Sequence, residues 1–295
     1  MKTGTVALPA PRSRLADFVA LTKPRLNSLV VVTTGVGYLG GSGAEFDLVV
    51  FVNTTVGAAL VAGSAAALNQ IAERDLDERM RRTRDRPIPA GRLQPADAAW
   101  AAVLLAVVGL AQLSLGASLA AAVVALATLV SYVGVYTPLK RRTHWALLVG
   151  AVPGGLPVVI GWAAAGPLSA GAWSLFAIVF VWQLPHFLAL TWLYRDDFAN
   201  ARLPLLSVND PSGLRTARHL VAYTVLLVPV SLMPTWIGLT GPAYATGAAM
   251  LGTVLLVLGM RFAASRSINR ARAFFRATLL YLPLIWGLLL VDAVG

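Results

Sequence analysis

Residues 49–87 read VVFVNTTVGAALVAGSAAALNQIAERDLDERMRRTRDRP, an apolar run that passes directly into a densely charged segment. About twenty apolar residues are enough for an α-helix to cross the hydrocarbon core of a bilayer. Strands of a membrane barrel alternate in polarity and are about half as long. The continuous run over 49–72 therefore predicts a membrane-spanning helix that ends in a charged loop.

Three oxygen-bearing side chains, Asn69, Glu73 and Asp77, are spaced four residues apart where this run ends. Each four-residue step turns about 400° on a helix, so the three stack along one face. Carboxylate and amide oxygens are ligands that Mg²⁺ accepts, usually together with substrate phosphates. Arg82 and Arg86 follow and could bind the remaining charge of a polyanion. The spacing predicts a metal–diphosphate site, and the alternative is a solvated loop beyond a membrane helix.

The composition extends this interpretation to the whole chain, with 57% hydrophobic and 13% charged residues and a mean hydropathy of +0.72. Such values indicate an all-α polytopic membrane protein. We expect one transmembrane domain over 1–295. Its predicted spans are about nine in number: 27–45, 49–72, 96–114, 117–137, 145–164, 170–193, 217–238, 242–262 and 273–292.

The 24 lysines and arginines lie in the N-terminal tail, 1–26, in the connections after the second, fourth, sixth and eighth spans, or at the edges of those connections. The positive-inside rule then places the tail and the long loops 73–95 and 194–216 in the cytosol, with the C-terminus outside. The tail favours a bacterial inner membrane over an organelle. Topology and anionic lipid explain the net charge of +11, so no nucleic-acid partner is expected.

The sixth predicted span contains Trp182, Gln183 and His186, and Asp196 and Asp197 follow at its cytosolic end. Polar and ionisable groups inside a span are costly and normally face a bundle interior or a wet cavity. His186 and Asp197 are about three helical turns apart, so both could face one cavity. Two interpretations of His186 stay open, an imidazole bonded across helices and a substrate contact.

Lys140, Arg141 and Arg142 form a cation cluster after the fourth span. They could bind phosphate, or they could serve only as the cytosolic anchor that topology requires. Tyr132 and Tyr136 lie one turn apart just before them. They could form an aromatic wall beside a carbocation or belong to the interfacial aromatic belt.

Five stretches together resemble the intramembrane prenyltransferases of the UbiA superfamily and, within it, the protohaem IX farnesyltransferase family. They are LTKPR (21–25), NQIAERDLDERMRRTRDRP (69–87), YTPLKRRT (136–143), WQLPHF (182–187) and YRDDF (194–198). The resemblance covers nearly the whole chain. It implies helices arranged around a central cavity, Mg²⁺ as cofactor, and farnesyl diphosphate and haem B as substrates. It also implies a haem A synthase as a possible partner.

The resemblance assigns roles to residues. The metal ligands that it implies are Asn69, Glu73, Asp77 and Asp197. These four residues and Lys140 are the implied catalytic residues. Glu73 stands where many members of the superfamily carry aspartate. The implied substrate contacts are Lys23, Arg25, Arg82, Arg86, Tyr136, Arg141, Arg142, Trp182, Gln183, His186 and Asp196. The chain departs from the pattern in its second acidic motif, which is reduced to Asp196 and Asp197, so the resemblance does not imply a complete second metal site.

The reaction that the resemblance implies is transfer of a farnesyl group to a vinyl group of haem B, with addition of water, to give haem O and diphosphate. A UbiA-type enzyme acting on a quinone or chlorin precursor is an alternative. A membrane transporter is another alternative. The polar groups of a transporter should gather near the midplane of the membrane, whereas the polar groups of this chain are predicted at one cytosolic face. A CDP-alcohol phosphotransferase is disfavoured because its signature contains an Asp-Gly pair, which this chain lacks.

Overall fold

The computed structural model describes residues 13–293, which are helical apart from turns and one isolated bridge between Thr240 and Ala293. The described part contains nine long helical segments, as predicted. They are α2 (Pro24–Ser42), α3 (Leu48–Ala72), α5 (Pro95–Gly116), α6 (Leu119–Val130) with its continuation through η1 (Ser131–Tyr136) and α7 (Thr137–Leu139), α8 (Ala146–Ala165), α9 (Ala170–Leu193), α11 (Leu214–Trp236), α12 (Pro242–Ser265) and α13 (Ile268–Val291). The short helices are α1 (Arg14–Leu21), α4 (Arg74–Asp77) and α10 (Arg195–Asn200).

Eight of the long segments in the described range are long and apolar enough to cross a membrane. The ninth, α2, does not meet that measure, and its first turns carry Asn27 and Ser28 among the apolar residues. The chain is therefore a multi-pass membrane protein. Several boundaries differ from the predicted ones by a few residues because polar caps begin the helices: Asp47 caps α3 and Ser267 caps α13.

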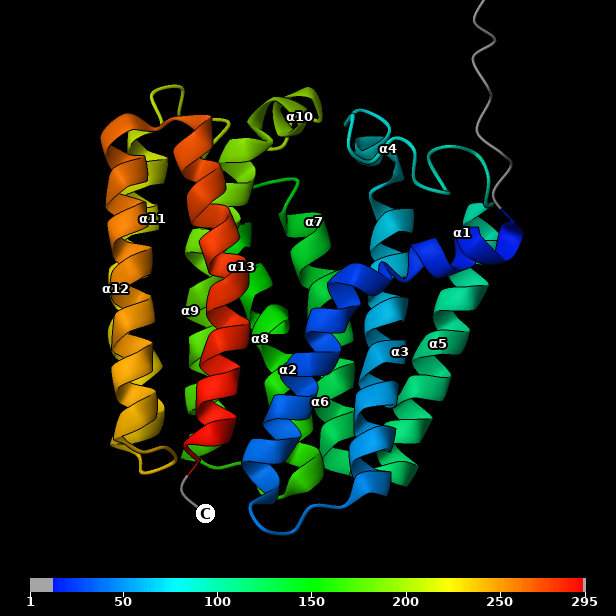
Figure 1. The fold of residues 1–295 in the computed structure, drawn as a ribbon. Helices are drawn as coiled ribbons and strands as arrows, with labels where there is room; N and C mark the ends of the chain where they lie inside the picture. Colours follow the sequence, from blue (N-terminus) through cyan, green and yellow to red (C-terminus); the bar gives the residue numbers. More distant parts are fainter. Residues whose placement is uncertain (1–12, 294–295) are drawn as a thin grey trace, which may run out of the picture.

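The long helices stand side by side, with α4, α10 and the end of α7 gathered at one end and the C-terminus at the other (Figure 1). Neighbouring pairs include α3 with α5, α2 with α8, and α9 with α11. The α2–α8 contact is close enough to require glycine on both sides. A Cβ on Gly161 would overlap the Thr34 carbonyl, and one on Gly37 would overlap the Val158 carbonyl. Such backbone contact is common where membrane helices pack through small residues.

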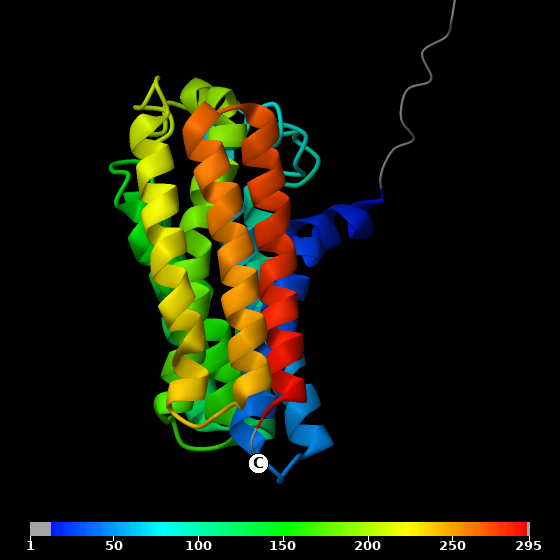
Figure 2. The ribbon, with the colours of Figure 1, turned by 60° about the vertical axis from the view of Figure 1, so that its left-hand side comes forward.

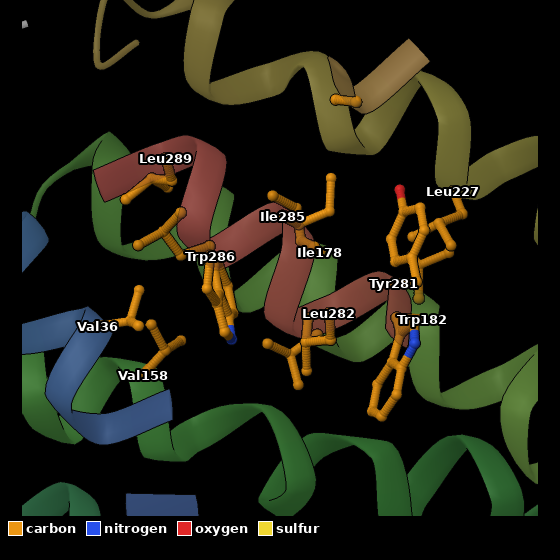
Figure 3. Packing of buried hydrophobic residues seen from close by; sticks show 14 of the residues in the cluster. Val36, Val158, Ile178, Trp182, Leu227, Tyr281, Leu282, Ile285, Trp286 and Leu289 are labelled. Atoms are coloured by element: carbon orange, nitrogen blue, oxygen red, sulfur yellow. The ribbon is translucent and has the colours of Figure 1, made fainter. Parts of the chain in front are cut away.

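A buried apolar cluster joins the first helices of the chain to the last (Figure 3). Val36 of α2 and Val158 of α8 pack against Trp286 of α13, and Ile178 and Trp182 of α9 belong to the same cluster. This packing holds helices that are far apart in sequence side by side, so that their ends near α4 and α10 gather around the region where the candidate site lies.

The N-terminal tail over 1–26 contains a helix that the sequence did not predict. Helix α1 forms inside it, projects sideways from the bundle (Figure 2), and is followed by α2 from Pro24. An eight-residue helix has little stability of its own. Here the buried Asp17 accepts a 2.9 Å hydrogen bond from Arg92, and Arg14 pairs with Asp97 at 2.6 Å. Residues 1–12 of the tail lie outside the described range.

Candidate active site

The acidic motif at the end of α3 is brought together, but not on one uninterrupted helix. The helix ends at Ala72, and Glu73 links it to α4 with φ −104° and ψ 12°. Backbone hydrogen bonds from Glu73 to the Asn69 carbonyl (2.9 Å) and from Asp77 to the Glu73 carbonyl (2.8 Å) preserve the helical spacing. Asn69, Glu73 and Asp77 are all buried, with at most 3% of their surface exposed. The predicted grouping is thus retained across a bend.

Cations from two later segments of the chain pair with the carboxylates. The Lys140 ammonium donates to both oxygens of Glu73, at 3.1 and 3.2 Å. Arg86 Nη1 donates to Asp77 Oδ2 at 2.6 Å. Both ion pairs are largely removed from solvent, since the acidic partners are 4% and 1% exposed. The charges are therefore little screened by water.

Lys23 reaches the same place from the junction of α1 and α2. Its Nζ donates to Asn69 Oδ1 at 3.3 Å, and Asn69 Nδ2 donates to Thr137 Oγ1 at 3.3 Å. The Lys23 backbone is left-handed, with φ 48°, between α1 and α2. A non-glycine residue in that region is strained, which is common at functional sites. Burial, with repulsion from Arg86, lowers the pKa of Lys23 to about 7.

We refer to these residues as the ion cluster: Lys23, Asn69, Glu73, Asp77, Arg86 and Lys140. Its three basic side chains outnumber its two carboxylates, so the cluster is suited to an anion. Burial raises the pKa of Asp77 although Arg86 opposes the change, and Asp77 Oδ1 is buried without a hydrogen-bond partner. An unpaired buried carboxylate oxygen is costly unless a cation binds it. Oxygens of Asn69, Glu73 and Asp77 make a donor set that suits Mg²⁺.

A π-helical turn, η1, lies beside the ion cluster. Thr137 Oγ1 donates to the Tyr132 carbonyl at 2.9 Å and accepts from Asn69, so it links this turn to α3. Turns of this kind inside α-helices are frequent at functional sites. The Tyr132 and Tyr136 rings lie with their centroids 5.4 Å apart. The two rings therefore lie next to each other, as their one-turn spacing in the sequence predicts.

Two mainly apolar cavities adjoin at these tyrosines. The first, of about 210 Å³, is walled by α2, α3, α6 and α8, and Lys23 is the charged residue in its wall. The second, of about 170 Å³, is lined by Tyr132, Tyr136 and Gln183 together with apolar residues. Tyr132 and Gly154 line both cavities. A Cβ on Gly154 would overlap the Gln183 side-chain oxygen, so glycine lets Gln183 approach the shared wall.

The loop after α9 packs over the loop after α3. The Arg82 backbone N–H donates to Asp197 Oδ2 at 3.3 Å, and its guanidinium lies 5.2 Å from the Tyr194 ring centroid. Buried residues of both loops, including Met80 and Phe198, form a small apolar cluster beneath. Over residues 13–293, no group of three His, Cys, Asp or Glu side chains is placed to hold a metal. A metal at the ion cluster would thus rely on Asn69 and on the oxygens of a bound anion.

Arg141 lies beside the ion cluster but is engaged elsewhere. Its guanidinium donates to both Asp75 oxygens, at 2.6 and 3.0 Å, and to the Ala72 carbonyl that ends α3. The hydrogen bond from Arg141 holds the pKa of Asp75 below its usual value. Arg141 therefore connects the last residue of α3 to Asp75 in α4.

Three further predicted substrate contacts, Arg25, Arg142 and Asp196, have exposed side chains outside the ion cluster. The Asp196 side chain is 95% exposed and lies 3.7 Å from its neighbour Arg195. Neighbouring residues in a short helix point in different directions, so the adjacent Asp196 and Asp197 cannot both face inward.

The aromatic motif of α9 divides between two surroundings. Gln183 lines the second cavity, whereas Trp182 is buried against α13 and donates to the Thr278 carbonyl at 2.9 Å. His186 Nδ1 lies 2.8 Å from Thr278 Oγ1. The cross-helix bond that the sequence left as one alternative for His186 is therefore present. Thr137 and Thr278 were missed from sequence, and only Thr137, inside YTPLKRRT, had a motif that could have drawn attention to it.

Comparison with known proteins agrees with this geometry. Residues 30–285 match the UbiA prenyltransferase family. The protoheme IX farnesyltransferase of Solibacter usitatus is 44% identical over 95% of this chain and 100% of its own length. That of an Anaeromyxobacter species is 43% identical over 97% of both chains.

Solved structures share the fold at low sequence identity. A digeranylgeranylglyceryl phosphate synthase structure is 15% identical, with a TM-score of 0.78 over 94% of this chain and 98% of that one. A UbiA homolog from Archaeoglobus fulgidus bound to GPP and Mg²⁺ is 12% identical, with a TM-score of 0.65 over 92% of this chain and 99% of the homolog. By fold and by sequence, the chain belongs to the UbiA prenyltransferase family.

Proposed function

We propose that the chain is a protohaem IX farnesyltransferase, which transfers the farnesyl group of farnesyl diphosphate to a vinyl group of haem B. Water adds in the same reaction, and the products are haem O and diphosphate. The observation that carries the proposal is a buried, cation-rich ion cluster directly beside two mainly apolar cavities. The names of the similar relatives identify the acceptor as protohaem.

The bond changes require little covalent chemistry from the protein. The allylic carbon–oxygen bond breaks, and its electron pair leaves on the diphosphate. A new carbon–carbon bond joins the farnesyl group to the vinyl carbon, and the cation left on the haem side chain takes hydroxide from water, releasing a proton. Mg²⁺, when bound, neutralises charge that develops on the leaving diphosphate.

The ion cluster can exchange partners when substrate binds. Lys140 and Arg86 now neutralise Glu73 and Asp77. A metal bound by the carboxylates would free both cations, which could then donate to diphosphate oxygens. Preorganised donors of this kind stabilise a developing anion because they need no rearrangement during the reaction. We therefore expect metal and diphosphate to bind cooperatively, each weakly without the other.

The adjoining cavities suit the remaining parts of the substrates. The first cavity would hold the isoprenoid chain, since its walls are mostly apolar and Lys23 marks its charged end. The second shares Tyr132 with it and would receive the vinyl edge of the porphyrin. The Tyr132 and Tyr136 rings present π faces that can stabilise a carbocation between the two cavities. Exclusion of bulk water delays quenching until the new carbon–carbon bond has formed.

We infer that the protein lies in the bacterial inner membrane with the ion cluster at the cytosolic face. The loops that carry the cluster gather at the end of the bundle opposite the C-terminus (Figure 1), which supports the orientation that the lysines and arginines predict. The product keeps a long apolar tail, so a membrane enzyme such as a haem A synthase is the expected recipient.

The function can be tested with purified protein supplied with haem B, farnesyl diphosphate and Mg²⁺, followed by mass spectrometry of the pigments. We expect a product heavier than haem B by one farnesyl group and one hydroxyl group. Chelation of the metal should stop its formation. A quinone or chlorin precursor offered in competition should stay unmodified, and prenylation of that acceptor with untouched haem would overturn the proposal.

A further inference from the structure

His186 is held on three sides. Its ring is stacked between Trp182 of α9 and Phe275 of α13, at centroid separations of 4.9 and 4.8 Å and interplanar angles of 20° and 27°. Its Nδ1 edge faces Thr278 Oγ1 at 2.8 Å. Both faces and one edge are therefore occupied, and the opposite edge, which carries Nε2, remains.

The hydrogen-bond network assigns the tautomer. Thr278 Oγ1 donates its only proton to the Phe275 carbonyl, at 2.6 Å. The hydroxyl can then only accept from His186, so Nδ1 carries the imidazole proton. A neutral imidazole protonated at Nδ1 has a free lone pair on Nε2.

His186 Nε2 is open to a ligand. It makes no hydrogen bond with any described residue, and it is not among the buried side-chain atoms that lack a partner in residues 13–293. An unused nitrogen lone pair within a membrane-spanning helix is unusual unless it has a function. Gln183 and Phe187, about 60° and 100° from His186 around the helix axis, line the second cavity. His186 is not itself among the residues that line that cavity, so it lies on the adjoining flank of α9.

We propose that His186 is an axial ligand of the haem B iron through Nε2, and that Thr278 is the positioning residue that fixes the competent tautomer and ring angle. The inference rests on the proposed function, which supplies haem as the substrate. A ligating histidine whose other nitrogen is hydrogen-bonded is the usual arrangement in metal sites. Ligation would anchor the porphyrin so that one vinyl edge stays beside Tyr132 while the farnesyl group arrives.

The test is a binding titration of the purified full-length protein, without farnesyl diphosphate, using ferric haem B and metal-free protoporphyrin IX as probes. The wild type should show the optical and electron paramagnetic resonance spectra of nitrogen-ligated iron. His186→Ala should lose that signature and bind haem at least tenfold more weakly, while its affinity for protoporphyrin IX stays unchanged. Retained porphyrin binding also shows that the variant is folded. His186→Gly supplied with free imidazole should regain the spectrum.

Thr278 is tested with two variants of similar size. Thr278→Val lacks the acceptor and should bind haem about tenfold more weakly, in the range seen when the partner of a metal-bound histidine is removed. Thr278→Ser keeps the hydroxyl and should retain the wild-type spectrum and affinity. If Thr278→Val matches the wild type in both, the positioning role is wrong.

Unchanged haem spectrum and affinity in His186→Ala would overturn the ligand assignment. The proposed function can fail separately. A wild type that makes haem O but shows no nitrogen-ligated iron refutes only the ligation, whereas one with the iron signature but no haem O refutes only the farnesyl transfer.

Discussion

Replacing Asp77 with asparagine removes one buried negative charge while leaving the size of the side chain almost unchanged. Asp77 Oδ2 accepts from Arg86 at 2.6 Å, and Oδ1 is the buried oxygen without a partner. Two unit charges about 4 Å apart interact by about 4 kcal/mol at an effective dielectric constant of about 20. The loss of one preorganised charge contact in an active site typically costs about 3 to 4 kcal/mol of transition-state stabilisation. We therefore expect Asp77→Asn to lower turnover by roughly 10²- to 10³-fold.

The stability of the Asp77→Asn variant should not fall together with its turnover. The pKa of Asp77 is raised by burial despite Arg86, so at neutral pH the ionised carboxylate destabilises the metal-free fold relative to a neutral group. Neutralising it should leave the thermal midpoint of the metal-free protein unchanged or higher. Activity would be lost without loss of folding.

Asp75→Asn is the matched control, since Asp75 lies in the same short helix and is also paired with an arginine. Its bond from Arg141 is at the surface, and such pairs contribute about 0 to 1 kcal/mol. This variant should keep turnover within a few-fold of wild type and lose a small amount of stability. Haem O formation and thermal unfolding are measured on both proteins. Equal turnover in Asp77→Asn and wild type, or equal losses in the two variants, would refute the metal-binding role of Asp77.

Further predictions concern the cation partner, the helix packing and the acid stability. Lys140→Met should leave Glu73 unpaired and weaken binding of a non-hydrolysable farnesyl diphosphate analogue with Mg²⁺ at least tenfold by calorimetry, and unchanged affinity would contradict the exchange of partners. Gly161→Ala should lower stability by about 1 to 3 kcal/mol because its Cβ overlaps a carbonyl of α2, whereas Gly287→Ala, which has open space, should be neutral in thermal unfolding. The Asp210 carboxylate is partly desolvated, but hydrogen bonds from the first turn of α11 hold its pKa below the usual value. The stabilisation that Asp210 contributes is therefore present above the unfolded-state pKa and lost as the pH falls through the folded-state pKa. Asp210→Asn should flatten this pH dependence of stability in acid unfolding curves. A curve identical to that of the wild type would contradict the role of Asp210.

The helices and the acidic motif could be predicted because each depends on local sequence. A span is a continuous apolar run, so all nine long segments were recognised, and the four-residue spacing of Asn69, Glu73 and Asp77 survives the bend at Glu73. The α1 helix could not be predicted, because it is stabilised by ion pairs with residues about 75 to 83 positions away in sequence.

The partners of individual side chains were the least predictable feature. Arg141 was grouped with Lys140 from sequence, yet the two point to different carboxylates, Asp75 and Glu73. Charge counting cannot separate adjacent residues that a helix end directs to different sides. Likewise, the bond between His186 and Thr278 joins α9 to α13 and leaves no local signature in the sequence.

The most direct test of the account is an experimental structure of the protein with Mg²⁺ and a non-hydrolysable farnesyl diphosphate analogue. The metal should be bound by oxygens of Asn69, Glu73 and Asp77, the diphosphate should contact Arg86 and Lys140 in place of their present partners, and the farnesyl chain should fill the first cavity. A diphosphate bound elsewhere, with the Lys140–Glu73 and Arg86–Asp77 pairs intact, would contradict it.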